Sequence, residues 1–211
     1  MLHEDALREA AHLAAEAVFQ TVAGYADGTY THEPTMTGAL AGALRTKLSG
    51  RIEGLTWSAH VMESGRGSAA EESATGADLL VHVRLDTPDL KYSKGLLIQS
   101  KRIEPKEAMT AEGHDDLLRQ CRKMLDITRA AYVFDYTRRT IRCGSAQVIV
   151  DSNNRHLYAQ CPRTPFRFFF EIFRSMIGDS IITSAKFDAL PVPNKISLTV
   201  TGDRDADFFR I

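Results

Sequence analysis

Apolar and polar residues alternate along this chain with two different periods. Apolar residues at every third or fourth position predict helices at residues 4–21, 34–48 and 114–128. Alternation at every second position, or a short apolar run between turn residues, predicts strands at residues 56–61, 95–101, 131–136 and 195–200. A further strand is predicted to begin at Asp78 and to end at the Pro-containing break of residues 87–89.

The order of the first seven elements is helix, helix, three strands, helix, strand. The helix at residues 114–128 lies between two predicted strands, and such a connection normally crosses over to place the second strand parallel to the first. The pattern therefore predicts an α/β fold in which helices flank a mixed central β-sheet.

An aromatic segment at residues 165–174 carries more aromatic area than one exposed helix can tolerate. We expect this segment to lie in the core. The alternative is that residues 166–173 form a contact between protomers.

Composition indicates a single globular domain over residues 1–211, with 44% hydrophobic and 25% charged residues. No apolar run approaches the roughly 18 residues that cross a membrane, and no secretory signal is evident. The three cysteines, Cys121, Cys143 and Cys161, are widely spaced, with no Cys-x-x-Cys pair. This spacing predicts reduced thiols in a cytoplasmic protein and argues against a zinc site.

The net charge of −1 gives no general attraction to nucleic acid, but the charge is unevenly distributed. Residues 1–100 carry 8 Lys and Arg against 13 Asp and Glu, and residues 101–211 carry 18 against 14. The asymmetry is compatible with a local basic surface, although ordinary surface variation would also produce it. A protein of this charge would bind nucleic acid weakly as a monomer, which favours a homodimer or a subunit of a larger complex.

Two strand ends bring together residue types suited to phosphate chemistry. Gly76-Ala77-Asp78 opens one apolar strand, and Gln99-Ser100-Lys101 ends another. Side chains alternate along a strand, so Gln99 and Lys101 project from one face while Ser100 points to the other. If the two strands pair, Asp78 can stand beside that face. A carboxylate, an amide oxygen and an ammonium could then hold a hard divalent cation and a phosphate.

At these residues the chain resembles the PD-(D/E)XK, or restriction-endonuclease-like, nucleases. The family motif is an Asp at the start of one strand and an acidic-x-Lys on the next, within an αβββαβ core. Gln99 occupies the acidic position here, which corresponds to a Gln-x-Lys variant of the motif. The resemblance covers residues 33–150 approximately and leaves 151–211 as a C-terminal extension.

The resemblance implies a metal-dependent endonuclease that hydrolyses DNA, with Mg²⁺ as cofactor and Mn²⁺ as a substitute. Asp78 and Gln99 would hold the metal, and Lys101 would act on the attacking water or on the developing negative charge. Bacterial restriction or phage defence is the setting implied. The alternative is a catalytically silent module of the same fold that binds nucleic acid or a protein partner, with Gln99 as the sign of lost activity.

The family also commonly places a Glu on a helix that precedes the sheet. Glu33 is the candidate here, both as a catalytic residue and as a metal ligand, because it stands at the predicted start of the second helix. A simple helix-capping role is equally open. Glu63, Glu71 and Glu72 are competitors for the same position.

Basic residues cluster in two places beyond the motif. These candidate contacts to the phosphates of double-stranded DNA are Arg119, Arg122 and Lys123 on the long helix, and Arg138 and Arg139 in a turn. The alternative is that both clusters are solvated faces. Gln120, on the same helix, could face either the site or solvent, and His82 is expected to be a core or rim histidine rather than a ligand.

Overall fold

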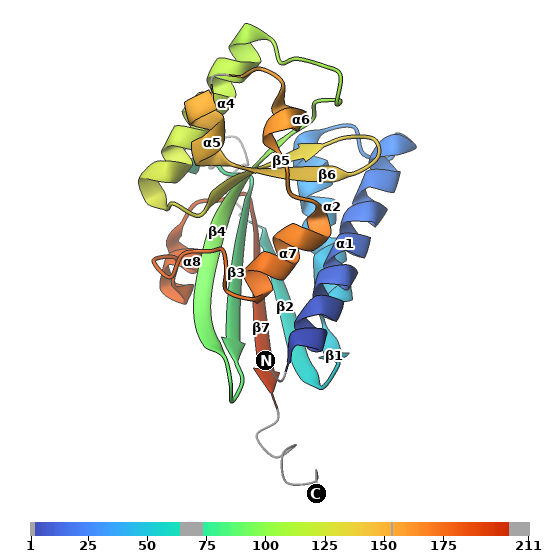
Figure 1. Cartoon of the computed structure of the whole chain (residues 1–211), viewed down its shortest axis with the longest axis vertical. Coiled ribbons are helices and arrows are strands. Elements are labelled where there is room, and N and C mark those ends of the chain that lie inside the picture. Colours follow the sequence, from blue (N-terminus) through green and yellow to red (C-terminus); the bar gives the residue numbers. More distant parts are fainter. Residues whose placement is uncertain (1–2, 64–73, 153, 203–211) are drawn as a thin grey trace, which may run out of the picture.

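The computed structural model describes residues 3–63, 74–152 and 154–202, and its centre is one seven-stranded mixed sheet (Figure 1). The strand order is β1-β2-β7-β3-β4-β5-β6. The strands are β1 (Gly50–Ile52), β2 (Leu55–Glu63), β3 (Leu79–Asp86), β4 (Lys91–Lys101), β5 (Ala131–Tyr136), β6 (Ile141–Ser145) and β7 (Asn194–Gly202). The prediction of an α/β fold with a mixed sheet flanked by helices is confirmed.

Two groups of helices cover the two faces of the sheet. One face carries α1 (Glu4–Ala26), α2 (Glu33–Lys47) and α7 (Pro165–Phe173). The other carries α4 (Ala111–Ile127), α5 (Ala146–Ser152), α6 (Leu157–Gln160) and α8 (Ser184–Ala189). Each group packs its own apolar cluster against the sheet. The central strands β3, β4 and β5 are therefore buried on both sides, whereas β2 alternates buried and exposed residues.

Strand β4 shows which side chains face which helices. Ile98 belongs to the cluster under α1, α2 and α7, whereas Leu97 belongs to the cluster under α4. Gln99 and Lys101 are in phase with Leu97, so both project from the α4 face of the sheet. Ser100 projects from the α2 face, where its hydroxyl lies 2.9 Å from that of Thr37.

The connections around β4 match the predicted order. β3 and β4 form an antiparallel hairpin in which Leu79 pairs with Ile98, and α4 then crosses over to bring β5 parallel to β4. The segment predicted as a C-terminal extension contributes β7, which lies between β2 and β3. The last described strand is therefore part of the same sheet. A short alternating segment of this kind carries no local signal that specifies which strands it pairs with.

The aromatic segment lies in the core, as expected. In α7, Phe168, Phe169 and Phe173 are buried, and the Phe168 ring packs edge-on against the rings of Tyr132 and Phe134 of β5. A contact between protomers through this segment stays a prediction.

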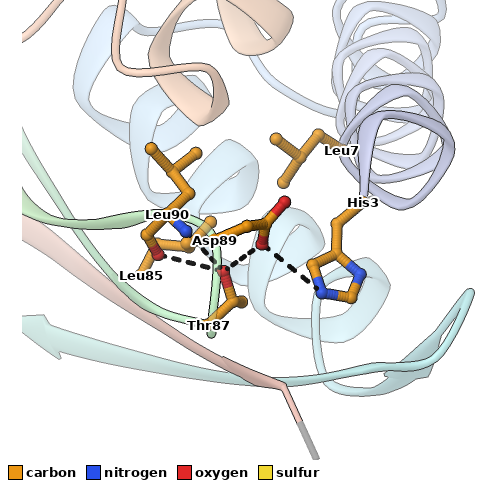
Figure 2. Close-up of a pocket in the computed structure, with 6 residues that line it drawn as sticks. All are labelled: His3, Leu7, Leu85, Thr87, Asp89 and Leu90. Carbon is orange, nitrogen blue, oxygen red and sulfur yellow. Dashed lines mark hydrogen bonds and ion pairs between the residues drawn. The ribbon is translucent and has the colours of Figure 1, made fainter. Parts of the chain in front are cut away.

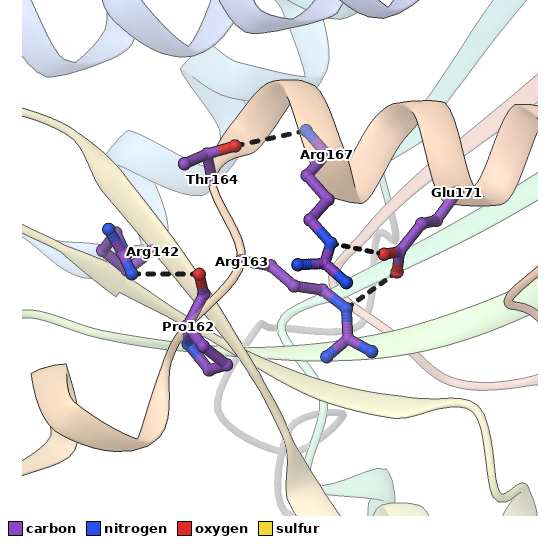
Figure 3. Close-up of polar contacts among 6 residues, drawn as sticks. All are labelled: Arg142, Pro162, Arg163, Thr164, Arg167 and Glu171. Carbon is purple, nitrogen blue, oxygen red and sulfur yellow. Dashed lines mark hydrogen bonds and ion pairs between the residues drawn. The ribbon is translucent and has the colours of Figure 1, made fainter.

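An ion-paired cluster fixes α7 to the preceding chain (Figure 3). Arg163 and Arg167 each donate a hydrogen bond to Glu171, at 2.8 and 2.7 Å, and use different carboxylate oxygens. Both oxygens of this buried acid therefore have a charged partner.

Cys121, Cys143 and Cys161 are all buried, free thiols. Within the described ranges, no helix combines the length and the apolar character that crossing a membrane requires.

Candidate functional site

The two halves of the sequence motif meet at the edge where β3 begins and β4 ends. The Gln99 Nε2 amide donates a hydrogen bond of 2.8 Å to Asp78 Oδ2, and the Ser100 backbone N–H donates another of 2.7 Å to the same oxygen. Asp78 is 6% exposed and Gln99 is 1% exposed. Charge-assisted hydrogen bonds of this length hold the carboxylate in one place.

The chain just before Asp78 packs closely against the backbone of α4. Gly76 has a φ of +73°, and a Cβ at this position would lie 2.4 Å from the Gln120 carbonyl oxygen. Only glycine fits both constraints. On the other side, the Asn194 backbone N–H and side-chain amide of β7 both donate to the Asp78 carbonyl oxygen at 3.2 Å. The Gly-Ala-Asp turn is therefore fixed by α4 and β7 together.

The amide oxygen of Gln99 has a different environment from its nitrogen. Because Nε2 donates to Asp78, Oε1 occupies the other branch of the amide and is directed away from that carboxylate oxygen. No donor among the described residues reaches Gln99 Oε1, although the atom is fully buried. A buried carbonyl oxygen without a donor costs about 1–3 kcal/mol. An amide oxygen in this environment is chemically able to coordinate a cation.

Lys101 projects from the same face as Gln99, at the last position of β4. Its ammonium makes no hydrogen bond or ion pair with any residue that the structure describes, and the side chain is half-buried. Burial raises the pKa of the Cys121 thiol of α4 to about 12, and the charge of Lys101 opposes that increase. The ammonium is thus close enough to α4 for its field to reach Cys121. Asp78 and Lys101 lie on the same face of the sheet, as a shared site requires.

A second acid lies on this face, and the sequence analysis did not single it out. Asp135 of β5 is 0% exposed and pairs in register with Lys101. Its Oδ1 accepts a hydrogen bond of 3.1 Å from the Ile103 backbone N–H, whereas no described donor reaches Oδ2. Burial raises the pKa of Asp135 to about 7, the Ile103 N–H opposes the increase, and the negative charges of Glu104 and Glu33 add to it. A signal existed in the sequence, since Asp135 interrupts an otherwise apolar and aromatic strand.

Glu33 lies at the same end of the sheet but belongs to the other layer. It is the first residue of α2, which packs on the opposite face from α4, and it is half-buried. Thr37, one turn further along, donates to the Glu33 carbonyl oxygen and contacts Ser100. The capping role and the ligand role both stay open for Glu33. Of its competitors, Glu71 and Glu72 lie outside the described residues, as does the side chain of Glu63.

The predicted nucleic-acid contacts lie on two surfaces. Arg119 and Arg122 are exposed and Lys123 is half-buried on α4, and Arg119 forms an ion pair of 2.8 Å with Asp116. Arg138 and Arg139 are exposed in the turn after β5.

Arg138 also lines a surface cleft of about 430 Å³. Its guanidinium and that of Arg102, the residue after Lys101, lie 5.9 and 5.6 Å from the centre of the Tyr25 ring. This cleft therefore opens at the end of the sheet that carries Asp78 and Lys101.

His82 is structural, whereas the role of the Gln120 side chain stays open. His82 is buried between the hydroxyls of Ser93 and Ser197, at 2.9 and 3.4 Å, as expected for a core histidine. Gln120 lies half-buried on α4 with its backbone against Gly76.

A separate pocket is distant from this chemistry (Figure 2). It is lined by His3, Leu7, Leu85, Thr87, Asp89 and Leu90, at the far end of the β3–β4 hairpin. Its volume of about 10 Å³ holds no more than a water molecule, so it is not a substrate site.

The described residues contain no group of three or more His, Cys, Asp and Glu side chains arranged to hold a metal ion. The donor set at the end of β4 is different in kind, because it combines carboxylates with an amide oxygen. Comparison with protein-family models, with curated proteins and with solved structures gave no match.

Proposed function

We propose that this protein is a Mg²⁺-dependent nuclease that hydrolyses phosphodiester bonds of DNA. The observation that carries the proposal is the contact between Asp78 and Gln99, with Lys101 on the same face of the sheet. The order of β3, β4, α4 and β5 around these residues is also the order that the motif requires.

Asp78 would hold the cation together with the Gln99 amide oxygen, once that amide exchanges its hydrogen bond to Asp78 for the cation, and Glu33 is proposed as a further ligand. When bound, the cation would neutralise the phosphate charge and orient a water molecule. The protein contributes a fixed carboxylate, since the Ser100 N–H and the Gln99 amide hold Asp78 in place before substrate arrives. With Gln99 in place of an acid, one negative ligand is missing from this pair. We therefore expect tighter metal binding once a substrate phosphate adds its charge.

Lys101 is proposed to stabilise the negative charge that develops as the phosphodiester is attacked. Its ammonium is held on the α4 face without an ion-pair partner among the described residues, so it can interact with a substrate phosphate. An ammonium that acts on developing charge accelerates the chemical step more than it tightens substrate binding.

The substrate is proposed to be double-stranded DNA. Arg138, with Arg102 and Tyr25, lines a cleft at the end of the sheet that carries the site, and Arg139 is the next residue of the same turn. Arginine side chains in such positions suit contacts to phosphate oxygens. Arg119, Arg122 and Lys123 of α4 are proposed to make separate phosphate contacts on the other surface.

We further propose that the protein acts as a homodimer, or as a subunit of a defence complex, in the bacterial cytoplasm. Its net charge of −1 provides little general attraction to DNA, so a second subunit would supply additional contacts. The three free thiols suit a reducing compartment.

A catalytically silent nucleic-acid-binding or protein-binding module is the second candidate. The orientation of Gln99 favours it, because the amide presents its nitrogen rather than its oxygen to Asp78. That hydrogen bond stabilises the carboxylate without a cation. A silent module would keep this arrangement permanently.

Incubation with supercoiled plasmid distinguishes the two candidates. The nuclease proposal predicts nicked or linear product with Mg²⁺ or Mn²⁺, none with a chelator, and none for Asp78→Ala with either metal. Lys91→Ala is the control, since Lys91 lies at the opposite end of β4 in an exposed ion pair with Asp86. If neither the parent nor Gln99→Glu cleaves DNA or RNA with either metal, the silent module is the better account.

A further inference from the structure

Asp135 has an environment that a purely structural acid would not need. Its side chain is completely buried, one of its oxygens has no donor among the described residues, and its strand neighbour is Lys101. Burying a carboxylate without compensating its charge is costly, and a bound ion is one of the explanations for such a group in a native protein.

The Gln99 amide oxygen is a second and independent atom of this kind. It is buried, has no described donor, and projects from the same face of the neighbouring strand. Gln99 pairs with Val133, so Asp135 is its diagonal neighbour two residues further along β5. Parallel strands lie about 4.8 Å apart and rise about 3.3 Å per residue, so these diagonal neighbours are about 8 Å apart at the backbone, a distance that a long side chain can span.

These atoms together suit a hard cation. Carboxylate and amide oxygens are the ligands that Mg²⁺ and Mn²⁺ prefer in proteins. Asp78 and Asp135 approach Gln99 from the two strands that flank β4, and both belong to the face covered by α4. Glu33 belongs to the helix on the opposite face, so Asp135 is the better placed of the two additional acids.

We propose that Asp135 supplies the second carboxylate of a divalent-cation site shared with Asp78 and the Gln99 amide oxygen, which turns toward the cation as its amide releases Asp78. It replaces, from the adjacent strand, the acid that is absent from position 99. The inference rests on the proposed function for its biological meaning, but it concerns cation binding and can be tested without any substrate.

The test is a titration of Mn²⁺ into the full-length protein, followed by the EPR signal of the free ion. We expect Asp135→Asn to weaken Mn²⁺ binding by at least about tenfold, because even the outer partners of metal ligands contribute that much. Asp126→Asn is the matched control, since it removes an exposed carboxylate from α4 and should leave the affinity unchanged.

A double variant separates metal ligation from a structural role. Gln99→Glu restores an acid to β4, so combining it with Asp135→Asn should recover most of the lost Mn²⁺ affinity. A structural defect at Asp135 would not be rescued from position 99. Circular dichroism melting without metal shows whether each variant is folded before the titration is interpreted.

Three outcomes overturn the inference: Asp135→Asn binds Mn²⁺ as the parent does, the double variant shows no recovery, or the folded parent binds no Mn²⁺ at millimolar concentration. The first two outcomes leave the nuclease proposal intact if the parent cleaves DNA. Conversely, Mn²⁺ binding that depends on Asp135, in a protein that cleaves no nucleic acid, supports the cation site and removes the nuclease proposal.

Discussion

Two buried acids on neighbouring elements, Asp135 and Glu171, have opposite electrostatic environments. Burial would raise the pKa of Glu171, but hydrogen bonds and charges from Arg167 and Arg163 outweigh it, so the pKa is lowered (Figure 3). Burial raises the pKa of Asp135 to about 7, and no guanidinium or ammonium forms an ion pair with it within the described ranges.

The contrast distinguishes a structural acid, Glu171, from a candidate binding-site acid, Asp135. Glu171 ties α7 to the chain before it, and its charge is fully used by two arginines. Asp135 is buried with one oxygen that has no described hydrogen-bond donor. Its neighbours Lys101 and the Gln99 amide oxygen also have no described partner. Uncompensated polar atoms that converge on one face indicate a binding site more specifically than buried charge alone.

The largest effect on stability is expected at Asp78, which resembles Glu171 in being held by two donors. Asp78→Ala removes the acceptor of the Ser100 N–H and the shorter of the two hydrogen bonds of the Gln99 amide nitrogen, which should cost about 3 kcal/mol. Urea denaturation measures this cost, and Mn²⁺ binding should be lost as well. If the variant is as stable as the parent, these two hydrogen bonds do not hold the site together.

Glu171→Gln tests the compensated acid. The substitution leaves Arg163 and Arg167 without their shared charge, and we expect a loss of about 1–2 kcal/mol because both arginines retain some solvent contact. Cleavage and Mn²⁺ affinity should match the parent in the folded state. A specific loss of cleavage in Glu171→Gln would mean that this cluster belongs to the site.

Asp135→Asn should have the most informative pH dependence of the three substitutions. With chelator present, the folded protein keeps a proton on Asp135 between the ordinary carboxyl pKa and about pH 7, while the unfolded chain has lost it. This group therefore makes the free energy of unfolding decrease as pH rises through that window.

Asp135→Asn removes that contribution, so its advantage over the parent should grow with pH up to about pH 7 and then level off. Urea denaturation of both proteins at several pH values measures the difference. A constant difference between parent and variant from pH 4 to pH 8 would show that Asp135 does not titrate in this range.

Part of this candidate site could be predicted because its residues lie on two strands that the local sequence pattern identifies. Strand alternation and one hairpin position Gly76, Asp78, Gln99 and Lys101. Both features can be predicted from the hydrophobic pattern. The same alternation predicts that Gln99 and Lys101 project from one face, and this prediction needs no knowledge of the tertiary fold.

Other features depend on long-range packing. The position of β7 between β2 and β3 and its support of Asp78 through Asn194 depend on pairing across more than half of the chain. The sequence pattern did not indicate Asp135 as a candidate site residue, because its proximity to the site comes from its register with Lys101. That register is set by the crossover through α4. The orientation of the Gln99 amide follows from the Asp78 contact and has no counterpart in the sequence pattern.

Single-turnover cleavage of a DNA duplex by Lys101→Ala tests the central claim most directly. The account predicts a rate at least about a hundredfold below the parent, with Mn²⁺ and DNA affinities largely unchanged, because the ammonium acts on the transition state. If Lys101→Ala cleaves as fast as a parent that is active, Lys101 is a solvated strand end and the proposed site is wrong.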